Sequence, residues 1–169
     1  YEYGGGGASK VTIHKIGSDF YSATSAENTN NIWMGHSVAA TANHIYVHGS
    51  DGLFGSMGIT LLKLDRSNMA LVGSLSCQFE LEQWKPVRFG KWHMDTDGNY
   101  LYAIANYDKG RLRKYTLDAT LVSQTNLSYS IYDGANMCVD ASGTIYIRWG
   151  DQIRVHGGSS IGTPSSTIS

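Results

Sequence analysis

The sequence is poor in proline, cysteine and charge, and it contains no long apolar run. Its 169 residues include 2 prolines and 2 cysteines, and Asp, Glu, Lys and Arg make up 16% of the chain. A formal net charge of −1 provides no electrostatic attraction to nucleic acid. Because a membrane-spanning helix needs about 20 mostly apolar residues in a row, we expect neither membrane insertion nor a nucleic-acid partner.

The two cysteines, Cys77 and Cys138, belong to neither a CxxC motif nor a Cys/His cluster, so they do not indicate a metal site. They are compatible with one disulfide or with two buried thiols. Because cysteine is among the most frequently buried residue types, we expect two small core residues. The glycine run at 4–7 lacks the Lys-Ser/Thr pair of a phosphate-binding loop, and we expect no cofactor.

The sequence is rich in glycine and in short apolar segments. It has 20 glycines, and 41% of its residues are hydrophobic and 11% aromatic. Such a composition is globular, and the length fits one domain with a substantial core. These values favour many short strands joined by tight turns over helices. The sequence therefore predicts an all-β fold.

An Ile/Leu-Tyr pair between two turns occurs several times. It is found at 43–49, 98–106 and 143–150, and a degenerate copy opens the chain at 1–4. Upstream of the pair lies a segment of small or apolar residues, and downstream lie a segment that usually carries Lys and then a polar segment. In the third copy the four segments are 92–95, 98–106, 111–115 and 121–128. This order predicts an antiparallel meander with turns made by Gly, Asn, Asp and Ser.

The repeated tyrosines also define a period. The spacings between Tyr1, Tyr46, Tyr102 and Tyr146 are 45, 56 and 44 residues, and an insertion at 79–86 accounts for the longest. The chain has no initiator methionine and starts inside a copy, so we expect a processed or truncated polypeptide.

This pattern resembles the blades of β-propellers, whose period is about 40–50 residues with four strands in each blade. The match is to the generic blade and to no particular family. It implies an all-β fold of antiparallel four-stranded meander repeats, arranged as a propeller or propeller fragment with three full blades and a partial one. The repeats occupy 1–156, with approximate blades at 1–30, 36–76, 90–128 and 134–166, and 157–169 is a Gly/Ser/Thr-rich outer strand or linker. A sandwich or an unrelated meander is the alternative.

The candidate binding residues come from the starts of the upstream strands. His36, Trp92 and Asn136 each precede their tyrosine by ten residues. The resemblance implies that such positions lie near the central channel of a propeller. Beside Trp92, His93 and Asp95 have the spacing of a base and its orienting carboxylate, but no nucleophile accompanies them.

We predict ligand contacts from His36, Trp92, His93, Asp95, Asn136 and Trp149. We assign no catalytic residue and no metal ligand. His44 and His48 share one strand face, yet a useful metal site needs three or four ligands, and the sequence places no third one nearby.

The predicted function is a non-catalytic binding module that presents aromatic and polar loops to a glycan or protein partner. Trp33, Trp84, Trp92 and Trp149 lie in or next to loops with Asn, Asp and Arg. Flat aromatic faces beside polar groups suit sugar rings, and they also dominate protein interfaces. The low-charge composition, rich in Ser, Thr, Asn and Gly, suits an extracellular setting such as a virion or cell surface.

Two alternatives remain open at this stage. One is a propeller-based hydrolase or lyase that uses residues near His36, Trp92, His93 and Asp95. The other is a structural piece of a larger assembly, in which other chains or a missing segment complete the ring.

Overall fold

The computed structural model describes residues 11–16, 23–28, 34–50, 59–76, 93–105, 110–127, 129, 136–157 and 164–169. These residues contain fourteen strands in four antiparallel sheets, and no helix occurs among them. None of them forms a helix long and apolar enough to cross a membrane. The degenerate copy at 1–4, the insertion at 79–86, and Cys77, Trp33, Trp84 and Trp92 lie outside the described residues.

The first sheet pairs β1 (Val11–Ile16) with β2 (Ala23–Asn28), and the other three have four strands each. The second sheet consists of β3 (Met34–Ala40), β4 (His44–Ser50), β5 (Ile59–Asp65) and β6 (Leu71–Ser76). The third consists of β7 (His93–Thr96), β8 (Tyr100–Ala105), β9 (Arg111–Thr116) and β10 (Leu121–Asn126). The fourth consists of β11 (Met137–Val139), β12 (Ile145–Trp149), β13 (Gln152–His156) and β14 (Ser166–Ile168). In every sheet, consecutive strands are hydrogen-bonded neighbours.

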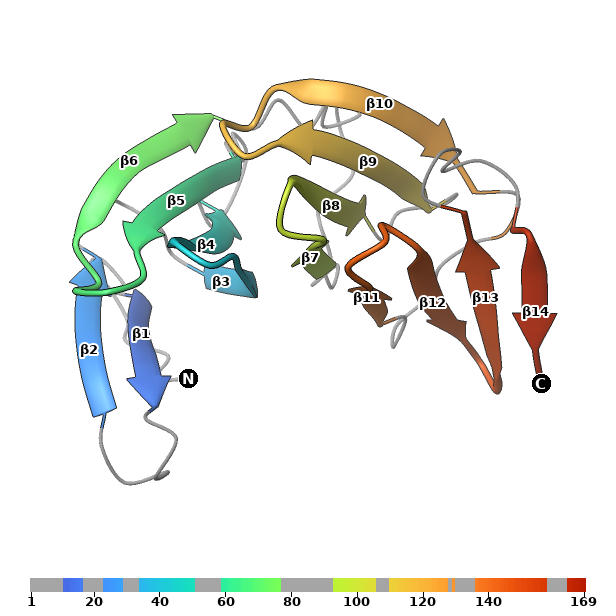
Figure 1. Cartoon of the computed structure of the whole chain (residues 1–169), viewed down its shortest axis with the longest axis horizontal. Helices are drawn as coiled ribbons and strands as arrows, with labels where there is room; N and C mark the ends of the chain where they lie inside the picture. Colours follow the sequence, from blue (N-terminus) through green and yellow to red (C-terminus); the bar gives the residue numbers. More distant parts are fainter. Residues whose placement is uncertain are drawn as a thin grey trace.

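The four sheets stand side by side along an arc (Figure 1). The strands β3, β7 and β11 line its inner side, and β6, β10 and β14 form its outer side. The first and fourth sheets lie at the two ends, and the sheets do not close into a ring. This arrangement confirms the predicted fold class, an all-β set of antiparallel meanders arranged as a propeller fragment with three full blades and a partial one.

The strand register shows that the repeated tyrosines are structurally equivalent. Each lies opposite an inner-strand residue: Ala39 faces Tyr46, Asp95 faces Tyr102 and Cys138 faces Tyr146. Since side chains alternate between the faces of a strand, the three tyrosines mark the same face of each sheet, which we call the tyrosine face.

The register corrects the expected equivalence of His36, Trp92 and Asn136, which rested on counting ten residues back from each tyrosine. Asn136 was expected at the same level as His36 and Trp92, but the turn before Tyr146 is one residue longer than the corresponding turns. Asn136 therefore lies level with Ser37 and His93, because its main-chain oxygen accepts the N–H of Arg148, two residues past the tyrosine.

The turns that precede these tyrosines are capped by short polar side chains. Asp97 Oδ1 accepts the N–H of Tyr100 at 2.7 Å, and its Oδ2 accepts the hydroxyl of Tyr102 at 2.8 Å. In the fourth sheet, Asp140 Oδ1 accepts the N–H of Thr144 at 3.0 Å, and Oδ2 accepts the hydroxyl of Tyr146 at 3.1 Å. Such side-chain acceptors satisfy the N–H groups that a tight turn leaves unpaired.

Hydrophobic side chains fill the spaces between neighbouring sheets. The tyrosine face of the second sheet packs on the third, with Tyr46 and Leu61 against Leu101 and Tyr115. The tyrosine face of the third sheet packs on the fourth through a second cluster, which contains Tyr102, Ile104, Leu112, Leu127, Tyr129, Met137, Ile145 and Ile147. The second and third sheets thus each bury their tyrosine face against the next sheet, as in other layered β-proteins.

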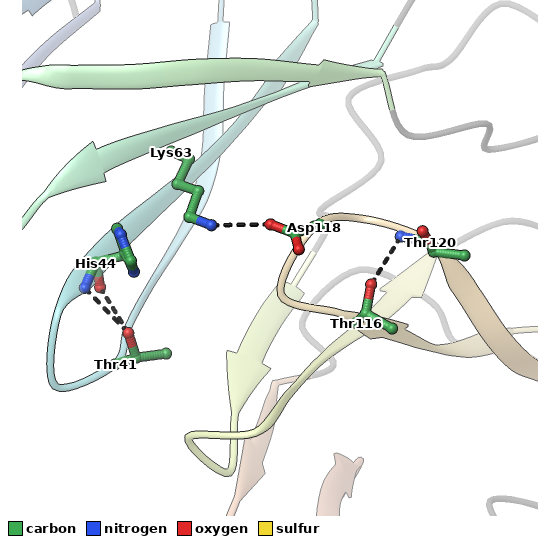
Figure 2. A network of polar contacts seen from close by, with 6 residues as sticks. All are labelled: Thr41, His44, Lys63, Thr116, Asp118 and Thr120. Carbon is green, nitrogen blue, oxygen red and sulfur yellow. Dashed lines mark hydrogen bonds and ion pairs between the residues drawn. The ribbon is translucent and has the colours of Figure 1, made fainter.

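Polar contacts add to this packing at the sheet ends. Figure 2 shows Lys63 of β5 reaching Asp118 in the turn between β9 and β10, with Nζ and Oδ1 2.9 Å apart. In the same view Thr41 Oγ1 accepts the N–H of His44 at 3.1 Å within its own turn. The ion pair thus joins two sheets, whereas the threonine stabilises one turn.

The expectation that Cys138 is a core residue is wrong. Its side chain is exposed, because it lies on the tyrosine face of the fourth sheet and no further sheet of the described chain covers that face.

Candidate functional site

Side chains on the inner strands join neighbouring sheets. Ser37 Oγ of β3 accepts the N–H of Met94 in β7 at 2.8 Å and donates to the carbonyl oxygen of the same residue at 3.2 Å. Asp95 Oδ2, also in β7, accepts the N–H of Val139 in β11 at 2.7 Å. The inner strands of three sheets are therefore connected through polar side chains.

The predicted pair His93 and Asp95 lies on this inner strand. The two side chains share one face of β7, and both are half-buried. Asp95 uses its second oxygen as well, because Oδ1 accepts the N–H of Thr96 at 2.8 Å. With both carboxylate oxygens bound to main-chain groups, Asp95 holds two strands together.

The other inner-strand candidates are placed only in part. His36 lies in β3, but its side chain, like the whole of Trp92, is outside the described part of the structure. Asn136 is exposed just before β11. It lies at the same end of the fourth sheet as Trp149, the last residue of β12, so the structure brings these two predicted residues to one edge.

Trp149 belongs to a group of ring and guanidinium side chains between the third and fourth sheets. The guanidinium carbon of Arg154 lies 3.8 Å from the centroid of the Tyr129 ring and 4.4 Å from that of Trp149. The two rings meet edge to face, with centroids 6.0 Å apart. We call Tyr129, Trp149, Arg154 and His156 the Arg154 cluster.

Strand register explains why these residues meet. Ile147 lies opposite Arg154, and Ile145 opposite His156. Alternation then places Trp149 and both isoleucines on the face that packs against the third sheet, together with Arg154 and His156. Tyr129 reaches them from the segment that follows β10.

The inner part of the Arg154 cluster is closed to solvent. His156 is completely buried, and the Tyr129 hydroxyl lies 3.0 Å from its Nε2. Burial raises the pKa of Tyr129 from 10.0 to about 12, while the charge of Arg154 acts in the opposite direction. Tyr129 is therefore a neutral, fixed ring over a wide pH range.

The outer part of the cluster, Trp149 and Arg154, is half-buried. The Nε atom of Arg154 is itself buried and has no acceptor among the described residues. A guanidinium held between two rings is positioned without a partner carboxylate, because cation–π contacts orient it. This arrangement can bind a planar or polar group, and its hydroxyl–imidazole pair, Tyr129 and His156, is buried. Within the described residues, no three His, Cys, Asp or Glu side chains form a potential metal site.

The sequence analysis named Trp149 but missed Tyr129, Arg154 and His156. Alternation in 145–149 and 152–156 is a signal that places Arg154 and His156 on the face of Trp149. Nothing local indicates Tyr129, since it lies 25 residues before Arg154 and joins the cluster only when two sheets pack.

The fold and this cluster define an all-β protein of repeated sheets with an aromatic and polar edge. No family model and no curated protein matches the chain. Among solved structures, a protein of unknown function from Bacteroides caccae is similar, with 12% identity, a TM-score of 0.57, and coverage of 93% of this chain and 53% of that one. Apo AztD from Citrobacter koseri is also similar, with 12% identity, a TM-score of 0.52, and coverage of 94% and 43%. The chain thus spans about half the length of these two structures, and at such low identity the likeness concerns the fold alone.

Proposed function

We propose that this protein is a non-catalytic binding module on a propeller-like scaffold, and that the edge around the Arg154 cluster contacts a glycan or protein partner. The observation that carries the proposal is the placement of Arg154 between the rings of Tyr129 and Trp149, at 3.8 and 4.4 Å. A positioned guanidinium beside a tryptophan loses little conformational entropy when a ligand binds.

The chemistry of this edge suits both partner classes. An indole face packs on the apolar C–H patches of a sugar, and Arg154 offers a polar group for hydroxyls. Trp, Tyr and Arg are also the residues most enriched at the energetic centres of protein interfaces. In either case, a glycan or a protein partner, the ligand is bound without being chemically changed.

The inner-strand residue Asp95 has a structural role that does not depend on a ligand. Its two oxygens accept the N–H groups of Thr96 and Val139 and join β7 to β11. We therefore assign Asp95 to structure and propose the sheet edge as the binding site.

The test is a glycan array combined with a pull-down, using the intact chain and matched variants. Trp149→Ala and Arg154→Met remove the proposed contacts, and Arg148→Ala is the control, because Arg148 is exposed on the opposite face of the same strand. We expect each cluster variant to weaken binding about tenfold or more, as loss of an aromatic or Arg hot spot does. Near-UV circular dichroism would establish that the variants stay folded. Absence of any ligand, or equal loss in the control, would contradict the proposal.

A further inference from the structure

The tyrosine face of the fourth sheet is a candidate interaction surface. Cys138 and Tyr146 lie opposite each other on it, and Val155 lies beside Tyr146 on the next strand. Ile153, two residues before Val155, lies on the same face. We call these four residues the end face. The exposed Arg148, which lies opposite Ile153, is on the same face.

Register gives three of the four end-face residues a buried counterpart in the second sheet. Cys138 and Ala39 each face the tyrosine of their own sheet, Tyr146 and Tyr46. Ile153 and Leu61 each face the residue two positions past that tyrosine. Val155 has the position of Lys63, which is half-buried.

Exposure separates the two sets. Ala39, Tyr46 and Leu61 are 4%, 0% and 1% exposed, since the third sheet covers them. Ile153 is 41% exposed, and Cys138 is exposed as well. The end face thus has the residue types and spacing of a face that is covered in the interior of the chain.

The opposite end of the arc also presents a sheet without a neighbour among the described residues. There β1 and β2 form the first sheet, and His14 on β1 is exposed. Figure 1 shows the first and fourth sheets at the two ends of the arc, with the opening of the arc between them. A partner that packed its own first sheet on the end face would continue the side-by-side stacking of the chain.

We propose that the end face binds a second copy of this chain, with the first sheet of one copy packed on the fourth sheet of the other. Two arcs joined in this way at both ends form a closed two-fold ring. The existing boundaries support this, because the tyrosine faces of the second and third sheets are each covered by the next sheet of the chain.

This inference is independent of the proposed ligand site. The Arg154 cluster lies on the other face of the fourth sheet, toward the third sheet. Loss of ligand binding and loss of self-association are therefore separable results.

The test is the molar mass of the 169-residue chain in solution over a wide range of concentration. We expect a concentration-dependent dimer. Ile153→Asp should raise its dissociation constant about tenfold or more, because the contact would lose an apolar side chain and would have to remove water from a carboxylate. Val122→Asp is the matched control, since Val122 is equally apolar and exposed but lies on the outer strand β10, and it should leave the dimer unchanged.

A second measurement covers the case in which Ile153→Asp fails to fold. In a Cys77→Ser chain, alkylation of the exposed Cys138 thiol should slow as the protein concentration rises, because dimer formation covers it. A monomer at every concentration would overturn the proposal, and the end face would then belong to a different polypeptide or to none. An association that Ile153→Asp does not weaken, or an alkylation rate independent of concentration, would overturn it equally.

Discussion

The carboxylate of Asp95 accepts the main-chain N–H of Val139 at 2.7 Å across the boundary between two sheets. A hydrogen bond to a charged acceptor stabilises more than a neutral one, and a main-chain donor left without a partner carries a desolvation cost. We therefore expect Asp95→Ala to lower the free energy of unfolding by about 1–3 kcal/mol in urea titrations. Asp95→Asn keeps one acceptor oxygen and should lose less. Equal stability of the alanine variant and the parent would show that this contact does not hold the sheets together.

The ion pair between Lys63 and Asp118 should contribute much less, although it also joins two sheets. Asp118 is largely exposed, with 79% of its side chain accessible, so water and salt screen the pair. We expect Asp118→Asn to cost below about 1 kcal/mol, and the difference should shrink as the salt concentration rises. A large loss that persists in high salt would contradict this ranking.

Ala119 has a φ of 63°, a left-handed conformation that glycine adopts without steric cost. Replacing it by glycine removes the strain but increases the freedom of the unfolded chain, and the first effect is the larger. We expect Ala119→Gly to raise the unfolding free energy by about 0.5–1 kcal/mol. The control is Ala141→Gly, because Ala141 also lies in a turn but has no positive φ, and it should be neutral or destabilising. Ala141 is exposed, whereas Ala119 is partly buried against the core, so the loss of that methyl contact reduces the gain at position 119.

Tyr129 should make the fold sensitive to alkali. Because burial raises its pKa from 10.0 to about 12, the folded state keeps the phenol proton after the unfolded chain has lost it. The stability it confers is complete below pH 10 and is lost as the pH rises to about 12. Two pKa units correspond to about 2–3 kcal/mol. Between neutral pH and pH 12, the free energy of unfolding should fall less steeply in Tyr129→Phe than in the parent chain. An identical slope would show that Tyr129 does not cause the sensitivity to alkali.

Asp140 should titrate at unusually low pH. The Ser142 hydroxyl and then the Thr144 N–H lower its pKa from 3.8 to about 2, and the Tyr146 hydroxyl contributes less. Its stabilising effect is present above pH 3.8 and is lost as the pH falls through about 2. NMR titration of the carboxyl carbon should show that Ser142→Ala raises this pKa more than Tyr146→Phe does. The reverse order would place the main contact at the tyrosine.

Much of the secondary structure was predictable because its signals are local. The segments expected at 111–115 and 121–128 are β9 (Arg111–Thr116) and β10 (Leu121–Asn126) in the structure. Gly110 precedes the first strand and Asp118 lies in the turn between the two, so turn chemistry and strand composition place both strands within a few residues. For 157–169 the sequence left a strand and a linker open, and the pairing of β14 with β13 gives the strand.

The candidate site was predictable only in part. Trp149 was predicted because it is an aromatic residue beside a turn, a property that can be read from the local sequence alone. Its contact with Tyr129 and Arg154 depends on two sheets packing face to face. The level of Asn136 was predicted incorrectly because the turn before Tyr146 has one extra residue. That residue shifts the inner strand by one position relative to its neighbour, and counting back from the tyrosine does not reveal the shift.

The sequence alone thus determined the all-β class, the repeat of four strands and most strand positions, because alternation and turn chemistry act between residues close together in the chain. Only the tertiary structure decided which faces are covered. Leu61 and Ile153 have the same place in their sheets, yet one is buried and the other exposed. The physical reason is that burial of a sheet face depends on the next sheet in space, and no pattern within the strand itself records whether that neighbour is present.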